Sequence, residues 1–115
     1  MKKKNVIKKY SEFQEILNTK KFKKNYPFVI YYNNRKYSYS RVGILITKKH
    51  GNAVIRNKIK RQIREMISEL LSFNEEYDFI ITFAKNYDIN CFHQYKKALK
   101  TILFSLKGEN NEQKN

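Results

Sequence analysis

The stretch from Gly51 to Glu65, GNAVIRNKIKRQIRE, restricts the fold of this chain more than any other. At about 100° per residue, its apolar side chains and those of the next turn fall within a stripe roughly 80° wide. The stripe consists of Ile55, Ile59, Ile63, Met66 and Leu70. Five cations precede the first anion and spread over the other side. The stretch therefore predicts a two-faced helix with Asn52 as its N-cap and an end near Phe73.

The positive charge of the chain is concentrated in its first half. Residues 1–64 hold 19 basic and 2 acidic side chains, whereas residues 65–115 hold 6 basic and 8 acidic ones, and the net charge is +15. Self-repulsion of that size calls for a polyanion, so nucleic acid is the expected partner. No apolar run reaches the roughly 18 residues of a membrane span, and the basic start lacks the apolar segment of a secretory signal. These features predict a cytoplasmic protein.

Three stretches rich in β-branched and aromatic residues predict strands: 28–32 (FVIYY), 41–48 (RVGILITK) and 77–84 (YDFIITFA). A weaker signal within 20–24 (KKFKK) predicts a short fourth strand, and 33–34 (Asn-Asn) predicts a turn. Because successive side chains of a strand alternate between faces, Tyr31 and Tyr32 should point to opposite sides of the sheet. One of them could then face a groove beside Phe13.

Helices are expected before and after these strands along the chain. The sequence Ser11-Glu12-Phe13-Gln14 fits a capping box and predicts the start of a short helix, and a last helix over 91–106 is expected to end at Gly108. The order of elements predicts an α/β sandwich with one layer of helices on a mixed sheet. We expect one RNA-binding domain over residues 1–108, with a basic N-terminal arm, and a frayed tail over residues 109–115.

The cationic side of the central helix is the first candidate binding surface. Arg56, Lys60 and Arg64 repel one another at i,i+4 spacing, whereas an exposed helix normally alternates its charges. A merely solvated face is the plain alternative. Cations about 6 Å apart fit successive phosphates and sugar hydroxyls of folded RNA. The candidate contact residues are Arg56, Asn57, Lys60, Arg61 and Arg64.

An aromatic constellation is the second candidate. Phe13 and Tyr31 form either a stacking surface for single-stranded RNA or an ordinary part of the core, and composition alone leaves both interpretations open. Lone Cys91 is expected to be a buried structural thiol.

The run from Arg41 to Glu65, together with the basic arm and FVIYY, closely resembles the protein subunit of bacterial ribonuclease P. Every position of the signature GNAVxRNxxKRxxRE is filled, and the resemblance covers roughly residues 2–107. It implies an α+β fold, a two-layer α/β sandwich of the ribosomal protein S5 domain 2-like type. It also implies a mixed four-stranded sheet and a left-handed β-α-β crossover, an exception to the right-handed rule.

The resemblance further implies a function. Such a protein joins the catalytic ribonuclease P RNA, with one protein expected per RNA, to remove the 5′ leader of precursor tRNA. The RNA with its Mg²⁺ ions performs the hydrolysis. The residues of the cationic helix side would contact the catalytic RNA. The leader would bind at Phe13, Leu17, Tyr31, Lys48 and Lys49. Leu17 departs from the aromatic residue often found at that position, and it cannot stack.

Two rival functions need to be weighed. A protein nuclease could use His50 and His93 as an acid/base pair, although a lone histidine in a basic loop or helix is usually structural. Glu65 and Glu69 could suggest a metal site, but ion pairs with Arg61 and Arg64 are the simpler expectation. A ribosomal or generic RNA-binding protein is the second rival, and it predicts no preference for precursor over mature tRNA.

Overall fold

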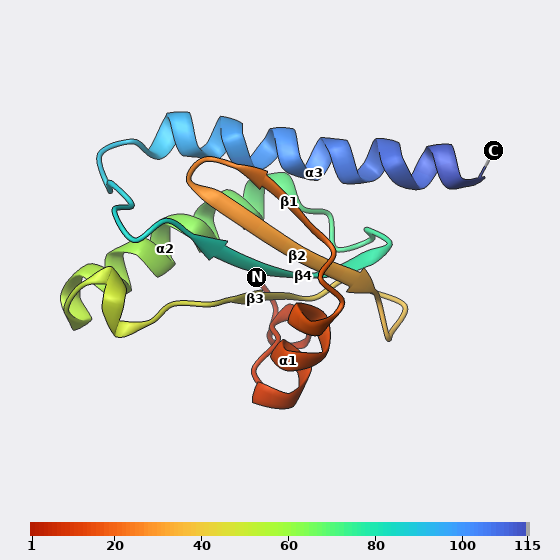
Figure 1. The fold of residues 1–115 in the computed structure, drawn as a ribbon, viewed down its shortest axis with the longest axis horizontal. Helices are drawn as coiled ribbons and strands as arrows, with labels where there is room; N and C mark the ends of the chain where they lie inside the picture. Colours follow the sequence, from red (N-terminus) through yellow and green to blue (C-terminus); the bar gives the residue numbers. More distant parts are fainter. Residues whose placement is uncertain (115) are drawn as a thin grey trace.

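The computed structural model describes the backbone of residues 1–114 and the side chains of residues 1–107. Three helices and four strands form one α+β unit (Figure 1). In chain order they are α1 (Tyr10–Asn18), β1 (Phe22–Asn25), β2 (Phe28–Asn34), β3 (Val42–Ile44), α2 (Ala53–Leu70), β4 (Tyr77–Phe83) and α3 (Phe92–Lys114). Two 3-10 turns, η1 (Lys3–Asn5) and η2 (Lys48–His50), precede α1 and α2.

The four strands form one mixed sheet in the order β1-β2-β4-β3. The pairs β1–β2 and β2–β4 are antiparallel, and β3 lies parallel to β4. The parallel pair is joined through α2, and this is the β-α-β unit for which the sequence resemblance implies a left-handed crossover. The predicted sandwich with a mixed four-stranded sheet is confirmed.

The two faces of the sheet are covered unequally. Alternate residues of β2 and β4, such as Ile30 and Phe79, pack under α2 and α3 in the main hydrophobic core. The other face carries a smaller cluster in which Ile16 of α1 packs on Ile80 of β4 and Ile7 of the N-terminal arm. In Figure 1, α3 lies along one side of the sheet and α1 lies on the other side. One short helix therefore covers the second face, which corrects the prediction of a single layer of helices.

Several predicted boundaries are confirmed, and others are wrong. The weakly predicted fourth strand exists as β1, and the helix that follows Asn52 exists as α2, although it ends at Leu70 rather than near Phe73. Asn33 and Asn34 do not form a turn. They extend β2, because the seven-residue strand β4 offers partners for both.

The predicted capping box of α1 is also wrong. The helix begins one residue before Ser11, and its N-cap, Lys9, makes no side-chain capping bond. The carboxylate of Glu12 instead forms an ion pair with Arg41, with 2.7 Å between Glu12 Oε2 and Arg41 Nη1. Within its first turn, α1 is therefore tied to a distant residue and lacks a side-chain cap.

The end of α3 differs from prediction as well. The helix continues through Gly108 to Lys114, because a glycine inside a helix costs about 1 kcal/mol relative to alanine and does not by itself stop it. The frayed tail expected over 109–115 stays a prediction, since the side chains there lie outside the described part. Cys91 is a half-buried free thiol packed against the main core. No helix among the described residues is long and apolar enough to cross a membrane.

Candidate RNA-binding surfaces

The start of α2 is fixed by its own sequence. The side chain of Asn52 accepts a hydrogen bond from the backbone N–H of Ile55 at 3.0 Å, which confirms the predicted N-cap. Gly51 has φ 123°, and a Cβ there would lie 3.1 Å from Ile55 Cγ2. Only glycine takes up this conformation without strain, so Gly51 allows the chain to turn sharply from η2 into α2.

The predicted two-faced character of α2 is confirmed. Ile59, Ile63 and Met66 are at most 1% exposed and lie in the core. Asn57, Arg61 and Arg64 are exposed and Arg56 and Lys60 half-exposed. Among the described residues, no ion pair joins an acidic side chain to this surface. We call Arg56, Asn57, Lys60, Arg61 and Arg64 the cationic face of α2.

Lys48 and Lys49 lie just before this face. Both are exposed residues of η2, whose capping box joins Thr47 to His50. The backbone N–H of Lys49 donates to Thr47 Oγ1 at 3.3 Å, which helps to hold the turn in place. The structure thus puts two further cations at the end of the sheet where α2 begins.

The predicted aromatic constellation comes together on the other face of the sheet. Phe13 and Leu17 of α1, Tyr31 of β2 and Leu45 after β3 are all half-buried around the second hydrophobic cluster. Tyr32 lies in the main core, so the prediction that Tyr31 and Tyr32 point to opposite faces is confirmed. We call Phe13, Leu17, Tyr31 and Leu45 the α1 patch.

Sequence reasoning missed two residues that extend this patch. Phe22 of β1 pairs with Tyr31 in the sheet, its ring centroid lies 5.4 Å from that of Tyr31, and it is 41% exposed. Lys24 Nζ lies 5.5 Å from the centroid of the Phe22 ring. The signal was present in KKFKK, where one aromatic residue stands among four lysines. It was weak because β1 is only four residues long.

Gly43 is a third residue that sequence reasoning missed. A Cβ at this position would lie 2.7 Å from Phe13 Cζ and 2.9 Å from Ile80 Cδ1. The absence of a side chain on β3 therefore allows the Phe13 ring to lie directly on the sheet. Any larger residue would push Phe13 away and deform the patch.

A buried charge network ties α1 to the sheet. Arg41 Nη1 lies 2.7 Å from Glu12 Oε2, and Arg41 Nη2 lies 2.9 Å from Asp78 Oδ2. The hydrogen bond from Arg41 holds the pKa of Glu12 below its ordinary value of 4.5, although burial opposes this. Burial alone would lower the pKa of Arg41, but hydrogen bonds to Asp78 and Glu12 raise it overall. Since Phe13 follows Glu12, the network also orients the α1 patch.

The two histidines of the rival nuclease lie in different surroundings. His50 Nδ1 accepts from the backbone N–H of Thr47 at 3.1 Å, and Nε2 lies 3.2 Å from the carbonyl oxygen of Phe83, which requires its proton. This imidazole therefore holds two segments together. His93 is exposed at the start of α3, with Phe92 as its ring contact.

The expected ion pair of Glu69 with an arginine of α2 is wrong. Glu69 pairs with Lys96 of α3 rather than with an arginine of its own helix. The reason is that α2 and α3 pack side by side, which brings Lys96 within reach. Among the described residues, no group of three or more His, Cys, Asp or Glu side chains is arranged to hold a metal ion.

The comparison with known proteins decides the family. Residues 1–107 match the family described as Ribonuclease P. The chain belongs to the ribonuclease P protein family. The ribonuclease P protein component of Mesoplasma florum is 46% identical over 105 residues, which make up 90% of this chain and 96% of that protein. That of Listeria innocua is 42% identical over 105 residues, 90% of this chain and 88% of that protein.

Solved structures of ribonuclease P proteins have the same fold. The Staphylococcus aureus protein superposes with a TM-score of 0.75 at 36% identity, covering 90% of this chain and 95% of that one. The Thermotoga maritima protein gives a TM-score of 0.66 at 25% identity, covering 80% of this chain and 88% of that one. The chain is therefore the protein subunit of ribonuclease P, which matures the 5′ end of tRNA, and its partner is ribonuclease P RNA.

Proposed function

We propose that the cationic face of α2 binds the catalytic RNA and that the α1 patch holds the single-stranded 5′ leader of precursor tRNA. The observation that carries this proposal is the separation of two surfaces with different chemistry. One surface is a row of cations without acidic partners among the described residues, on a helix that covers the main core. The other is a group of half-buried aromatic and aliphatic side chains on the opposite face of the sheet.

Each surface suits a different form of RNA. Arginine and lysine side chains spaced along a helix fit phosphates of a folded RNA, and each contact adds close to one unit of salt dependence. Aromatic rings such as half-buried Tyr31 and exposed Phe22 can stack on unpaired bases with little sequence preference. The leader is unpaired, so the α1 patch should hold it largely independently of its sequence. Lys48 and Lys49 of η2 would screen leader phosphates at the end of the sheet where α2 begins.

We assign the catalytic Mg²⁺ to the RNA. Magnesium prefers hard oxygen ligands such as phosphates and carboxylates. The proposed RNA-binding surfaces offer cations, an amide and rings, and a face of arginine and lysine repels a dication. The protein would thus reduce repulsion between leader and catalytic RNA without taking part in the bond cleavage. We further propose one protein per RNA.

The test of the leader assignment compares precursor with mature tRNA. In a complex reconstituted with bacterial ribonuclease P RNA, Phe13→Ala and Tyr31→Ala should each lower the affinity for precursor tRNA about ten-fold, because each removes stacking on a base. The affinity for mature tRNA should not change. Leu17→Phe should raise the affinity for the precursor, since it adds a ring to the patch.

The control is Phe104→Ala, which removes an aromatic side chain that is 73% exposed on α3. It should leave both affinities unchanged. If the wild-type complex binds precursor and mature tRNA equally well, the α1 patch does not hold the leader. A generic RNA-binding protein would give that result.

A further inference from the structure

An aromatic pair lies outside both proposed surfaces. Tyr37 and Tyr39 of the loop between β2 and β3 stack with ring centroids 5.4 Å apart and an interplanar angle of 13°. Tyr37 is 51% exposed. Lys4 Nζ, from the N-terminal arm, lies 4.7 Å from the centroid of the Tyr39 ring. We call Lys4, Tyr37 and Tyr39 the loop platform.

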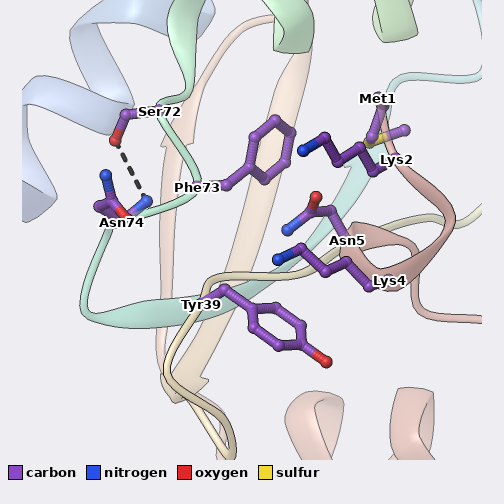
Figure 2. A pocket seen from close by; sticks show the side chains of 8 residues that line it. All are labelled: Met1, Lys2, Lys4, Asn5, Tyr39, Ser72, Phe73 and Asn74. Atoms are coloured by element: carbon purple, nitrogen blue, oxygen red, sulfur yellow. Dashed lines mark hydrogen bonds between the residues drawn. The ribbon is translucent and has the colours of Figure 1, made fainter.

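A pocket adjoins this platform. It has a volume of about 320 Å³ and lies between the N-terminal arm, the β2–β3 loop and the loop after α2. In Figure 2 the side chains of Lys2 and Lys4 extend from the N-terminal arm toward the side of the pocket that holds Phe73 and Tyr39. The volume is at the lower end of the range found for small-molecule sites, which suits a single nucleotide unit.

The walls of the pocket are held in place. The amide nitrogen of Asn5, which is 3% exposed, donates to the carbonyl oxygen of Ser40 at 2.9 Å. Phe73 has φ 67°, a left-handed conformation that a residue with a side chain rarely adopts unless its surroundings hold it there. Its carbonyl oxygen accepts from the backbone N–H of Ser40 at 2.9 Å. The N-terminal arm and the loop after α2 are therefore anchored to the same residue, and the site is largely preformed.

The chemistry of this site matches an unpaired nucleotide. Tyr37, the exposed ring of the platform beside the pocket, can stack on a base of any identity, and Lys2 and Lys4 at the pocket supply charge for its phosphates. Asn5 Oδ1 and the side chain of Asn74 add polar groups at the pocket wall. A folded duplex would offer no free base face to Tyr37, so the expected ligand is single-stranded RNA.

The position of the platform indicates which RNA strand it would bind. The β2–β3 loop and the loop after α2 lie at one end of the molecule, and the start of α2 lies at the other end (Figure 1). The platform is also linked to α1, because Arg41 Cζ lies 5.0 Å from the centroid of the Tyr37 ring while its guanidinium pairs with Glu12. The platform is thus linked through Arg41 and Glu12 to α1, the helix that carries Phe13 and Leu17 of the α1 patch, and it lies away from the start of α2.

We infer that the loop platform binds leader nucleotides that lie 5′ of those on the α1 patch. This inference rests on the proposed leader function of that patch. The 3′ end of the leader is at the cleavage site, close to the catalytic RNA, so its 5′ part should leave the complex in the direction of the platform. A longer leader would then gain contacts that a short one lacks.

The test measures affinity as a function of leader length in the complex of this protein with ribonuclease P RNA. For the wild type, lengthening the leader beyond the α1 patch should raise the affinity about ten-fold, the size expected for stacking of one base. Tyr37→Ala should abolish this gain and leave binding of a short-leader precursor unchanged. Tyr37→Phe should retain the gain, since its ring can still stack. Lys4→Gln should lower the salt dependence of long-leader binding by about one unit.

Phe104→Ala serves again as the matched control and should retain the full gain with leader length. The inference is overturned if Tyr37→Ala binds long leaders as well as the wild type does, or if it weakens short and long leaders equally. It is also overturned if the variant weakens association with the catalytic RNA alone, which would assign the platform to that RNA. A different result would show that the α1 patch does not bind the leader. In that case Phe13→Ala would leave the affinity for a short-leader precursor unchanged.

Discussion

Replacing Arg56, Lys60 and Arg64 together by glutamine should lower the affinity of the protein for ribonuclease P RNA about 10³-fold at physiological salt. A hydrogen bond to a charged group contributes roughly 1.5 kcal/mol, which corresponds to about ten-fold for each cation. The slope of log affinity against log salt should become shallower by roughly 2 to 3, because three fewer counterions are released. Equilibrium binding across a salt series measures both quantities.

The same variant should not be less stable than the wild type. The three cations lie at i,i+4 spacing on one helix, so their removal relieves repulsion worth a few tenths of a kcal/mol per pair. A thermal melt should therefore show an equal or higher midpoint. Weaker binding by a protein that is at least as stable points to lost contacts with RNA.

Three exposed lysines of α3 provide a control with the same change in charge, namely Lys97, Lys100 and Lys107. Their replacement by glutamine should reduce affinity much less, because they lie outside the cationic face of α2. An equal loss in both triple variants would mean that net charge alone drives binding. The assignment of this face to the catalytic RNA would then be wrong.

The second large effect is expected in the buried charge network. Asp78→Ala should lower the free energy of unfolding by about 3 kcal/mol, the lower end of the usual cost of breaking a buried ion pair, because Glu12 still pairs with Arg41. Asp78 is 2% exposed, and it accepts hydrogen bonds at 2.9 Å from both the backbone N–H and the guanidinium Nη2 of Arg41. Urea unfolding in the presence of sulfate, which screens the net charge, measures the loss.

A smaller companion change tests how the network depends on pH. Because its folded-state pKa is lowered, ionised Glu12 stabilises the fold above its ordinary pKa of 4.5, and this contribution is lost as the pH falls through the lowered value. Glu12→Gln should thus be less stable than the wild type near neutral pH, and the difference should shrink as the pH falls below 4.5. A difference that stays constant down to pH 3 would contradict the ion pair with Arg41.

The elements that the sequence predicted well are those whose signals are local. The structure confirms three predictions that depend only on neighbours along the chain. They are the helical spacing of Ile59 and Ile63, the N-cap Asn52, and the opposite directions of Tyr31 and Tyr32. The extension of β2 depended on a distant partner, because Asn33 and Asn34 pair with Asp78 and Tyr77 of β4. Glu12 likewise pairs with Arg41, 29 positions along the chain, a contact that the pattern around Ser11 could not reveal.

The candidate site shows the same division. The cationic face of α2 could be predicted because one helix carries all of it. The loop platform could not be predicted in this way. Lys4, Tyr39 and the wall of the adjoining pocket near residue 73 come from three segments, and only the sheet topology brings these segments together. Gly43 was likewise missed, because its importance depends on where the Phe13 ring lies.

The central claim is that the cationic face of α2 allows the catalytic RNA to work on its substrate at physiological salt. The most direct measurement is the rate at which ribonuclease P RNA forms the mature 5′ end of tRNA when Mg²⁺ is too low for the RNA alone. Wild-type protein should restore cleavage, the variant with glutamine at positions 56, 60 and 64 should not, and added Mg²⁺ should rescue it. Full-rate cleavage by that variant at low Mg²⁺ would contradict the claim.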